Sequence, residues 1–426
     1  MFFSALVLLM IGFPVAFVFG ATAVVFSLLF PEVGIEVFNF LPFRIYGIMQ
    51  NFTLMAVPLF IFMGLLLEKS DLARRLLESM AKLFGRINGG LAISVVLVGA
   101  ILAASTGIVG ASVVMMSVIA LPIMVKHSYD KSLASGAIAA SGTLGQLIPP
   151  SVVLIILGDV MSISVGDLFK AAILPGTLLI SLYLLYIIFI SWKNPHLAPS
   201  IVDDETPRSD VYKEAFFAII PPLTLILSVL GSIFFGIASP TESAAVGVVG
   251  ALILSSINRK ISIKMVSESA LQTVRLTGMI FMILIGATAF SLVFNELGGS
   301  EIILDFFTQE HFSKWAFVLL SMLVIFILGF FIDFVEIAFI VVPILLPVVE
   351  VLAINPLWYA ILIAMNLQAS FLTPPFGFAL FFLKGAANNL VSTIEIYKGV
   401  IPFIILQLLA LAIIMIFPEI VSILLS

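Results

Sequence analysis

The sequence predicts an all-α protein that crosses a lipid bilayer several times. Hydrophobic residues make up 62% of its 426 residues and charged residues only 10%, whereas soluble globular proteins carry about 25% charged residues. The charges are clustered, and the uncharged runs between them each reach the roughly 20 residues that span a bilayer as a helix. These runs are residues 1–31, 45–67, 87–125, 132–158, 171–192, 215–241, 276–295, 351–383 and 399–418. A soluble enzyme, a nucleic-acid-binding protein and a disordered scaffold are therefore excluded.

Cysteine is absent, which excludes thiol catalysis, disulfides and thiolate metal sites. The first apolar run has neither a basic segment before it nor a small-residue cleavage site, and further spans follow it. We therefore expect a retained first helix rather than a cleaved signal peptide.

Loop charges predict the orientation of the chain in the membrane. Segment 68–86 is basic and its apolar residues recur at helical spacing, so we expect an amphipathic helix on the cytoplasmic surface. Segment 258–275 is also basic and is expected inside, whereas the acidic segment 296–314 is expected outside. The N-terminus is expected in the cytoplasm.

Two halves of the sequence resemble each other at a shift of about 225 residues, which indicates an internal repeat. We expect the first repeat in residues 1–192, a linker and connecting span in 193–236, and the second repeat in 237–426. The matching landmarks are IPPS (148–151) with TPPF (373–376), ALPIM (120–124) with LLPVV (345–349), residues 13–25 with 239–251, and the basic segment 68–86 with the acidic segment 294–312.

The number of spans predicts that the two repeats are inverted relative to each other. Each half offers four spans and one more joins them, so the second half enters the membrane upside down. The loop charges agree, because the basic segment of the first half is expected inside and its acidic counterpart outside. Inverted-topology repeats are typical of secondary transporters.

Each half contains a segment that predicts a re-entrant helical hairpin. In the first half it covers about 91–124, with a tip near Ser105, Thr106 and Gly107; an ordinary tight helical hairpin is the alternative. Its apolar arms, about 91–104 and 112–124, would each be some 20 Å long, shorter than the bilayer core of about 30 Å. The second hairpin is expected at about 315–349.

The tip of the second hairpin carries two acidic residues, Asp333 and Glu336. A carboxylate at membrane depth is costly unless it pairs, takes up a proton or binds a cation. We therefore expect Asp333 to be functional, although a shallow tip that touches water is an alternative. Glu336 is expected on the wetter side of the tip.

A span broken by a proline pair follows each hairpin, at about 132–158 and about 358–383. A proline pair removes two backbone donors, and such irregular backbone is tolerated in a membrane only where it is buried in protein or lines a wet cavity. Freed carbonyls and Ser or Thr hydroxyls are hard oxygen ligands that suit Na⁺, and the helix start after each pair favours an anionic group. We interpret both breaks as ion or substrate sites; simple proline kinks are the alternative.

The remaining motifs indicate structural roles. SPTE at 239–242 predicts a helix capping box. Neither an HExxH motif nor a glycine-rich phosphate loop ending in GK[ST] occurs, so ATP-driven chemistry is not expected.

Six stretches combine into a specific pattern that covers essentially the whole chain: residues 68–90, ASTGIVGAS at the first tip, the PPS break, the TPPFG break, IASPTESAAVG (237–247) and residues 327–349. Together they resemble the large membrane subunit (DctM-like) of tripartite ATP-independent periplasmic (TRAP) transporters. The resemblance implies an elevator-type fold of the ion-transporter superfamily and no enzymatic activity. It also implies a bacterial inner membrane, a small four-helix membrane subunit, a periplasmic substrate-binding protein, and import of an organic acid with Na⁺ as the coupling ion.

The resemblance further implies the residues of the sites, several of them acting through backbone carbonyls. The first Na⁺ site would involve Ser105, Thr106, Gly145, Ile148 and Pro150, and the second would involve Phe330, Asp333, Thr373 and Phe376. The substrate would contact Ser105, Gly107, Thr143, Ser151, Thr373 and Gly377. After Asp333 the chain departs from the commoner family pattern, with Phe334-Val335-Glu336 in place of a stretch rich in Pro or small residues.

Three alternatives differ from this Na⁺-coupled symporter subunit. One is a stand-alone, ion-coupled antiporter of organic anions that needs no binding protein, and a second is a passive channel lined by the broken helices. The third is an intramembrane hydrolase that uses Ser105 or the Asp333/Glu336 pair. Aspartyl catalysis needs two carboxylates that share a proton at close reach, so two acids three residues apart on one tip form a poor pair.

Overall fold

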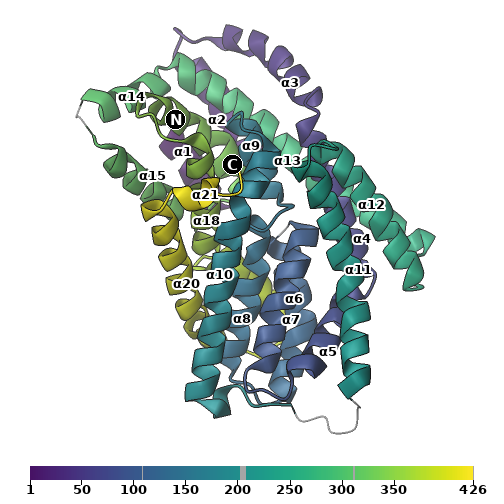
Figure 1. Ribbon diagram of the computed structural model, residues 1–426. Coiled ribbons are helices and arrows are strands. Elements are labelled where there is room, and N and C mark those ends of the chain that lie inside the picture. Colours follow the sequence, from purple (N-terminus) through teal and green to yellow (C-terminus); the bar gives the residue numbers. More distant parts are fainter. Residues whose placement is uncertain (108, 202–207, 310–311, 426) are drawn as a thin grey trace.

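The computed structural model describes residues 1–107, 109–201, 208–309 and 312–425, and its architecture is the all-helical one that the sequence predicts (Figure 1). No strand occurs among these residues. Within them, seven helices are long and apolar enough to cross a bilayer, and residues 35–49 and 53–69 form an eighth span if this pair, bent by 58°, counts as one. The seven are α7 (Val109–Lys126), α10 (Val165–Lys193), α11 (Arg208–Phe234), α12 (Pro240–Ile257), α13 (Ile263–Glu296), the segment Phe334–Val351 and α20 (Thr393–Ile416).

The helices follow one order twice. α2 and α12 begin 225 residues apart, and so do α8 and α18. The first series is α2 (Val15–Leu29), α3 (Leu41–Met49) with α4 (Ala56–Lys69), α5 (Leu72–Phe84), α6 (Gly90–Thr106), α7, α8 (Lys131–Thr143), α9 (Val152–Val160) and α10. The second is α12, α13, α14 (Gly299–Gln309), α15 (Lys314–Leu328), α16 (Phe334–Glu336) with α17 (Val342–Val351), α18 (Pro356–Leu372), α19 (Phe378–Ala386) and α20. α1 (Phe2–Ile11) precedes the first series and α11 joins the two.

The amphipathic helices of the two series lie at opposite ends of the molecule. In Figure 1, α5 is near the bottom and α14 near the top. This arrangement agrees with inverted repeats.

The hairpin arms are longer than we expected. α6 has 17 residues and α7 has 18, which correspond to about 26 and 27 Å at the helical rise. In the second hairpin, a π-helical segment at Ile337–Val341 separates α16 from α17.

The helices pack in two groups. α8 packs against α6, α7 and α20, and α18 packs against α15 and α20. We call α6–α10 and α15–α20 the core bundle. The second group, which we call the outer frame, is α2, α4, α11, α12 and α13, joined by the contacts of α2 with α13 and of α4 with α12. α4 also touches α6, and α13 touches the π-helical segment, so the groups meet along several helices.

The amphipathic helix predicted within segment 68–86 is confirmed as α5. Its buried residues recur at helical spacing: Leu72, Ala73, Leu76, Leu77, Ser79 and Met80. Lys82 forms an ion pair with Glu214 of α11 at 2.7 Å. The apolar stripe packs on α6, so α5 connects the core bundle to the outer frame.

The capping box predicted at 239–242 is also confirmed. The Glu242 carboxylate accepts hydrogen bonds from the backbone N–H of Ser239 at 2.8 Å and from its hydroxyl at 2.7 Å. Ser392 and Glu395 form a second complete capping box at the start of α20.

Substituting Gly399 tests the close packing of α8 on α20. A Cβ atom at Gly399 would overlap the carbonyl of Ser132, and one at Gly136 would overlap the carbonyl of Gly399. We expect Gly399→Ala to lower the melting temperature, because overpacking a core costs about 1–3 kcal/mol. Thermal unfolding in detergent measures this. Gly278→Ala on α13 is the matched control, since nothing lies within 4 Å of its added Cβ; equal melting temperatures of the two variants would contradict the packing.

Asp71, at the turn before α5, gives the fold a pH dependence. Its Oδ2 lies 2.6 Å from Nζ of Lys260, and this hydrogen bond holds the pKa of Asp71 below its usual range. A carboxyl whose pKa is lower in the folded than in the unfolded protein stabilises the fold at pH values above its unfolded-state pKa. This stabilisation is lost as the pH falls through the folded-state pKa.

We therefore expect Asp71→Asn to lower the melting temperature slightly at neutral pH, because exposed ion pairs contribute only about 0.2–1 kcal/mol. In acid the variant and the parent should converge. Asp305→Asn, at an exposed carboxylate without an ion pair to another described residue, should show no such convergence.

Candidate functional site

The tip of the first hairpin lies against the first helix break. Gly107 ends α6 in the left-handed conformation with φ of 59°. A Cβ at this position would lie 3.2 Å from the backbone nitrogen of Val152 and 3.6 Å from the carbonyl oxygen of Pro150. On the other side of the break, a Cβ at Gly145 would lie 3.3 Å from the carbonyl oxygen of Ala103. Two glycines therefore allow the tip and the break to meet through their backbones.

The first break is closed by a side chain. The Ser151 hydroxyl donates to the carbonyl of Gln146 at 2.7 Å and accepts from the N–H of Leu154 at 3.4 Å, so Ser151 caps α9. Ser151 is fully buried, whereas Ile148 is partly buried. The side chains of Ser105 and Thr106, which belong to the predicted site, lie outside the described residues.

The tip of the second hairpin lies against the second break in the same way. A Cβ at Gly329 would overlap the side chain of Ser370, near the end of α18. The rings of Phe331 and Phe376 stand 5.4 Å apart, which joins the tip to the residues after the proline pair. Thr373 donates its hydroxyl to the carbonyl of Ala369 at 2.8 Å. Both proline pairs, Pro149-Pro150 and Pro374-Pro375, contain a cis peptide bond.

The remaining residues predicted for the second site differ in exposure. Phe330 and Thr373 are half-buried, and Phe376 is exposed. Gly377 is buried, and a Cβ there would lie 2.5 Å from the carbonyl oxygen of Phe371. The packing where α19 begins therefore leaves no room for a side chain at this position.

The expectation for Glu336 is wrong. Glu336 is only 3% exposed and its Oε2 is buried without a hydrogen-bond partner, whereas Asp333 is half-buried. The reason is that the start of the second arm packs against α9 and α13. Asp333 accepts a hydrogen bond from the N–H of Phe334 at 2.8 Å.

The two hairpins also touch the opposite repeat. A Cβ at Gly110 of α7 would lie 2.9 Å from the ring of Phe382 on α19, while α16 packs against α9. Each second arm therefore contacts the broken helix of the other half. The two candidate sites belong to one packed unit.

A buried polar cluster, which the sequence analysis missed, lies between the two breaks. Thr143 accepts hydrogen bonds from Gln368 at 3.5 Å and from Gln407 at 3.4 Å, and all three are buried. Thr143 and Gln368 stand 225 residues apart, which is the repeat offset. The sequence offered one indication of this cluster, which is that both glutamines stand within uncharged, apolar runs. Thr143, predicted to contact substrate, here forms part of this cluster.

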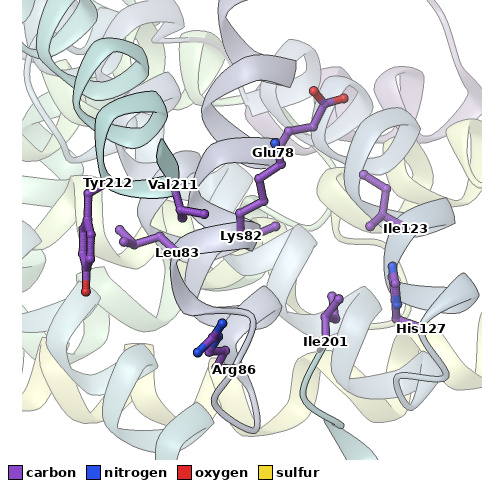
Figure 2. Close-up of a pocket in the computed structure, with 10 residues that line it drawn as sticks. Glu78, Lys82, Leu83, Arg86, Ile123, His127, Ile201, Val211 and Tyr212 are labelled. Atoms are coloured by element: carbon purple, nitrogen blue, oxygen red, sulfur yellow. The ribbon is translucent and has the colours of Figure 1, made fainter. Parts of the chain in front are cut away.

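Two cavities lie beside the core bundle. A groove of about 570 Å³ between α6, α10 and α11 is almost entirely apolar and reaches Ile148 and Pro149 at the first break. A second cavity of about 350 Å³ lies beside α5, where Figure 2 shows side chains from α5, from the end of α7 and from the start of α11. None of the predicted site residues lines this second cavity.

Comparison with known proteins identifies the family. The family described as "Tripartite ATP-independent periplasmic transporter, DctM component" matches residues 2–420. The large permease protein SiaM of a sialic acid TRAP transporter from Vibrio cholerae is 30% identical over 419 residues, which cover 98% of this chain and 96% of SiaM. The large permease protein DctM of a C4-dicarboxylate TRAP transporter from Rhodobacter capsulatus is 28% identical over 440 residues, which cover 98% of this chain and 96% of DctM.

The YdaH transporter from Alcanivorax borkumensis has the same fold, with a TM-score of 0.66 at 15% identity over 98% of this chain and 99% of that one. With a family match that runs nearly from end to end, this chain belongs to the DctM components of the TRAP transporters, a family of membrane transport proteins rather than enzymes.

Proposed function

We propose that this chain is the transport subunit of a Na⁺-coupled symporter that imports a carboxylate-bearing substrate delivered by a periplasmic binding protein. The relatives named above are large permeases of TRAP transporters for sialic acid and for C4-dicarboxylates, and both substrates are carboxylates. We also infer from the family that the chain works with a small four-helix membrane subunit in a bacterial inner membrane, with its N-terminus in the cytoplasm.

Free carbonyl oxygens at both breaks and at the tip of the second hairpin carry this proposal. The carbonyls of four predicted ligands accept no hydrogen bond from another described residue: Ile148, Pro150, Phe330 and Phe376. Carbonyl oxygens without a hydrogen-bond donor are available as ligands for a hard cation such as Na⁺. When bound, Na⁺ would supply positive charge next to an anionic substrate.

The residues predicted for the sites would have separate roles in binding Na⁺ and substrate. Ser105, Thr106, Gly145, Ile148 and Pro150 would hold the first Na⁺, and Phe330, Asp333, Thr373 and Phe376 the second. Asp333 is the one carboxylate in this predicted set. The backbone at Gly107 and Gly377 would allow the substrate to approach closely, and α9 and α19 would direct their N-terminal N–H groups toward its carboxylate. Thr143 and Ser151 would line this region from within the core bundle.

The two packing groups support an elevator mechanism. The core bundle contains both candidate sites, and it contacts the outer frame where α4 meets α6 and where α13 meets the π-helical segment. We propose that the core bundle slides against the outer frame, while α5 and α14 brace it at opposite ends of the molecule. Alternating access would then result from one rigid movement.

Asp333→Asn tests the second Na⁺ site. We expect it to abolish Na⁺-driven uptake without preventing expression, because the amide keeps the shape of the carboxyl but removes its charge. Uptake of a radiolabelled organic acid into proteoliposomes measures this, with Asp305→Asn on α14 as the matched control. Uptake equal to that of the parent protein would remove Asp333 from the mechanism.

Reconstitution tests the whole proposal. Candidate organic acids would be offered to proteoliposomes that contain this chain and its small subunit, with and without an inward Na⁺ gradient and added binding protein. We expect uptake only when both are present. Uptake that is driven by the Na⁺ gradient without added binding protein would favour the stand-alone transporter. Uptake by an intact complex that does not respond to the Na⁺ gradient would contradict ion coupling.

A further inference from the structure

Asp333 and Glu336 occupy the positions of a capping box. Asp333 is the N-cap residue of α16 and Glu336 stands three residues on. Two complete capping boxes in the same chain, Ser239–Glu242 and Ser392–Glu395, show how the two side chains of such a pair are placed. The tip of the second hairpin can therefore be compared directly with two reference sites in this protein.

In both reference sites the N-cap side chain donates to the glutamate. The hydroxyl of Ser239 lies 2.7 Å from Oε2 of Glu242, and that of Ser392 lies 2.8 Å from Oε2 of Glu395. An ionised aspartate at the N-cap cannot donate, because it carries only acceptor oxygens. At the tip of the second hairpin, the proton donor of the capping box is thus replaced by a second carboxylate.

The glutamate at the tip is also buried, unlike its counterparts. Glu242 and Glu395 make their hydrogen bonds in exposed positions, whereas Glu336 is 3% exposed and its Oε2 has no partner. The π-helical segment that begins at the next residue is an irregularity often found at functional sites. A buried carboxylate oxygen without a partner is costly, so it points to a ligand.

The surroundings of Glu336 supply no positive charge. Among the described residues, no Lys, Arg or His forms an ion pair with it. The helices packed against α16 and the π-helical segment are α9, α13, α15 and α17. Between Arg275 and Glu296, α13 has no charged residue. The charged residues of the other three are Asp159, which accepts from Asn51, Lys314 at the start of α15, and Glu350 near the end of α17.

We propose that Glu336 is a second carboxylate ligand of the cation site at the tip of the second hairpin, and that the cation binds between Asp333 and Glu336. This inference deepens the proposed function and rests on its Na⁺ coupling. Carboxylate oxygens suit hard cations, and the free carbonyls of Phe330 and Phe376 would complete the oxygen ligands. Two carboxylates give the site one more negative charge than Asp333 alone, so an anionic substrate would be repelled until the cation is bound.

Na⁺ binding to the purified chain in lipid nanodiscs tests this proposal without any transport. The melting temperature would be followed as NaCl replaces choline chloride at constant ionic strength. We expect Glu336→Gln to raise the Na⁺ concentration for half-maximal stabilisation by roughly tenfold or more, the range typical for losing a group that supports a metal site. Glu336→Asp keeps the charge on a shorter side chain, so its half-maximal Na⁺ concentration should lie between those of the parent protein and Glu336→Gln.

Glu350→Gln is the matched control, because it makes the same change at an exposed position on α17 and should titrate like the parent protein. Glu336→Gln that folds and also titrates like the parent would overturn the proposal, as would tighter Na⁺ binding by this variant. A parent protein that shows no stabilisation by Na⁺ would instead overturn the Na⁺ coupling of the proposed function. Loss of Na⁺ binding in Glu336→Gln but not in Asp333→Asn would keep Glu336 as a ligand and remove Asp333.

Discussion

The structure depends on one constraint, which is that a backbone carbonyl without a donor cannot face lipid. Each proline pair creates such carbonyls in the middle of a span. The chain encloses them by placing a hairpin tip against each break, and glycines at Gly107, Gly145 and Gly329 make this contact close enough. The crosswise contacts of α7 with α19 and of α9 with α16 then pack the two breaks into one unit.

The same constraint explains why the candidate sites are mostly backbone. Side chains that could compete for the free carbonyls are engaged elsewhere: Ser151 with Gln146, and Thr373 with Ala369. The carbonyls of Ile148 and Phe376 remain available. A site built in this way needs few charged residues, which is consistent with a chain in which charges make up only 10% of the residues. The two carboxylates at the second tip, Asp333 and Glu336, therefore depart from this backbone-based pattern.

Much of the fold could be predicted from local sequence, since apolar runs, the capping box at Ser239 and the helical spacing in α5 depend on near neighbours. The hairpin arms proved longer, because α6 continues up to Gly107. The burial of Glu336 could not be predicted, since it depends on α9, which is nearly two hundred residues away along the chain. Likewise, the cluster of Thr143, Gln368 and Gln407 joins residues 225 and 264 positions apart.

The hydrogen bond between Gln368 and Thr143 has a mechanical consequence. These residues hold equivalent places in the two repeats, and each lies in the helix that leads into a break. Breaking this bond would take an acceptor away from the buried amide of Gln368, which is costly, whereas the Thr143 hydroxyl would keep its bonds with Ala140 and Gln407. The hydrogen bond therefore joins the two broken helices directly. In the movement proposed above, this bond favours a joint displacement of the two breaks, so that both candidate sites would change sides of the membrane in one step.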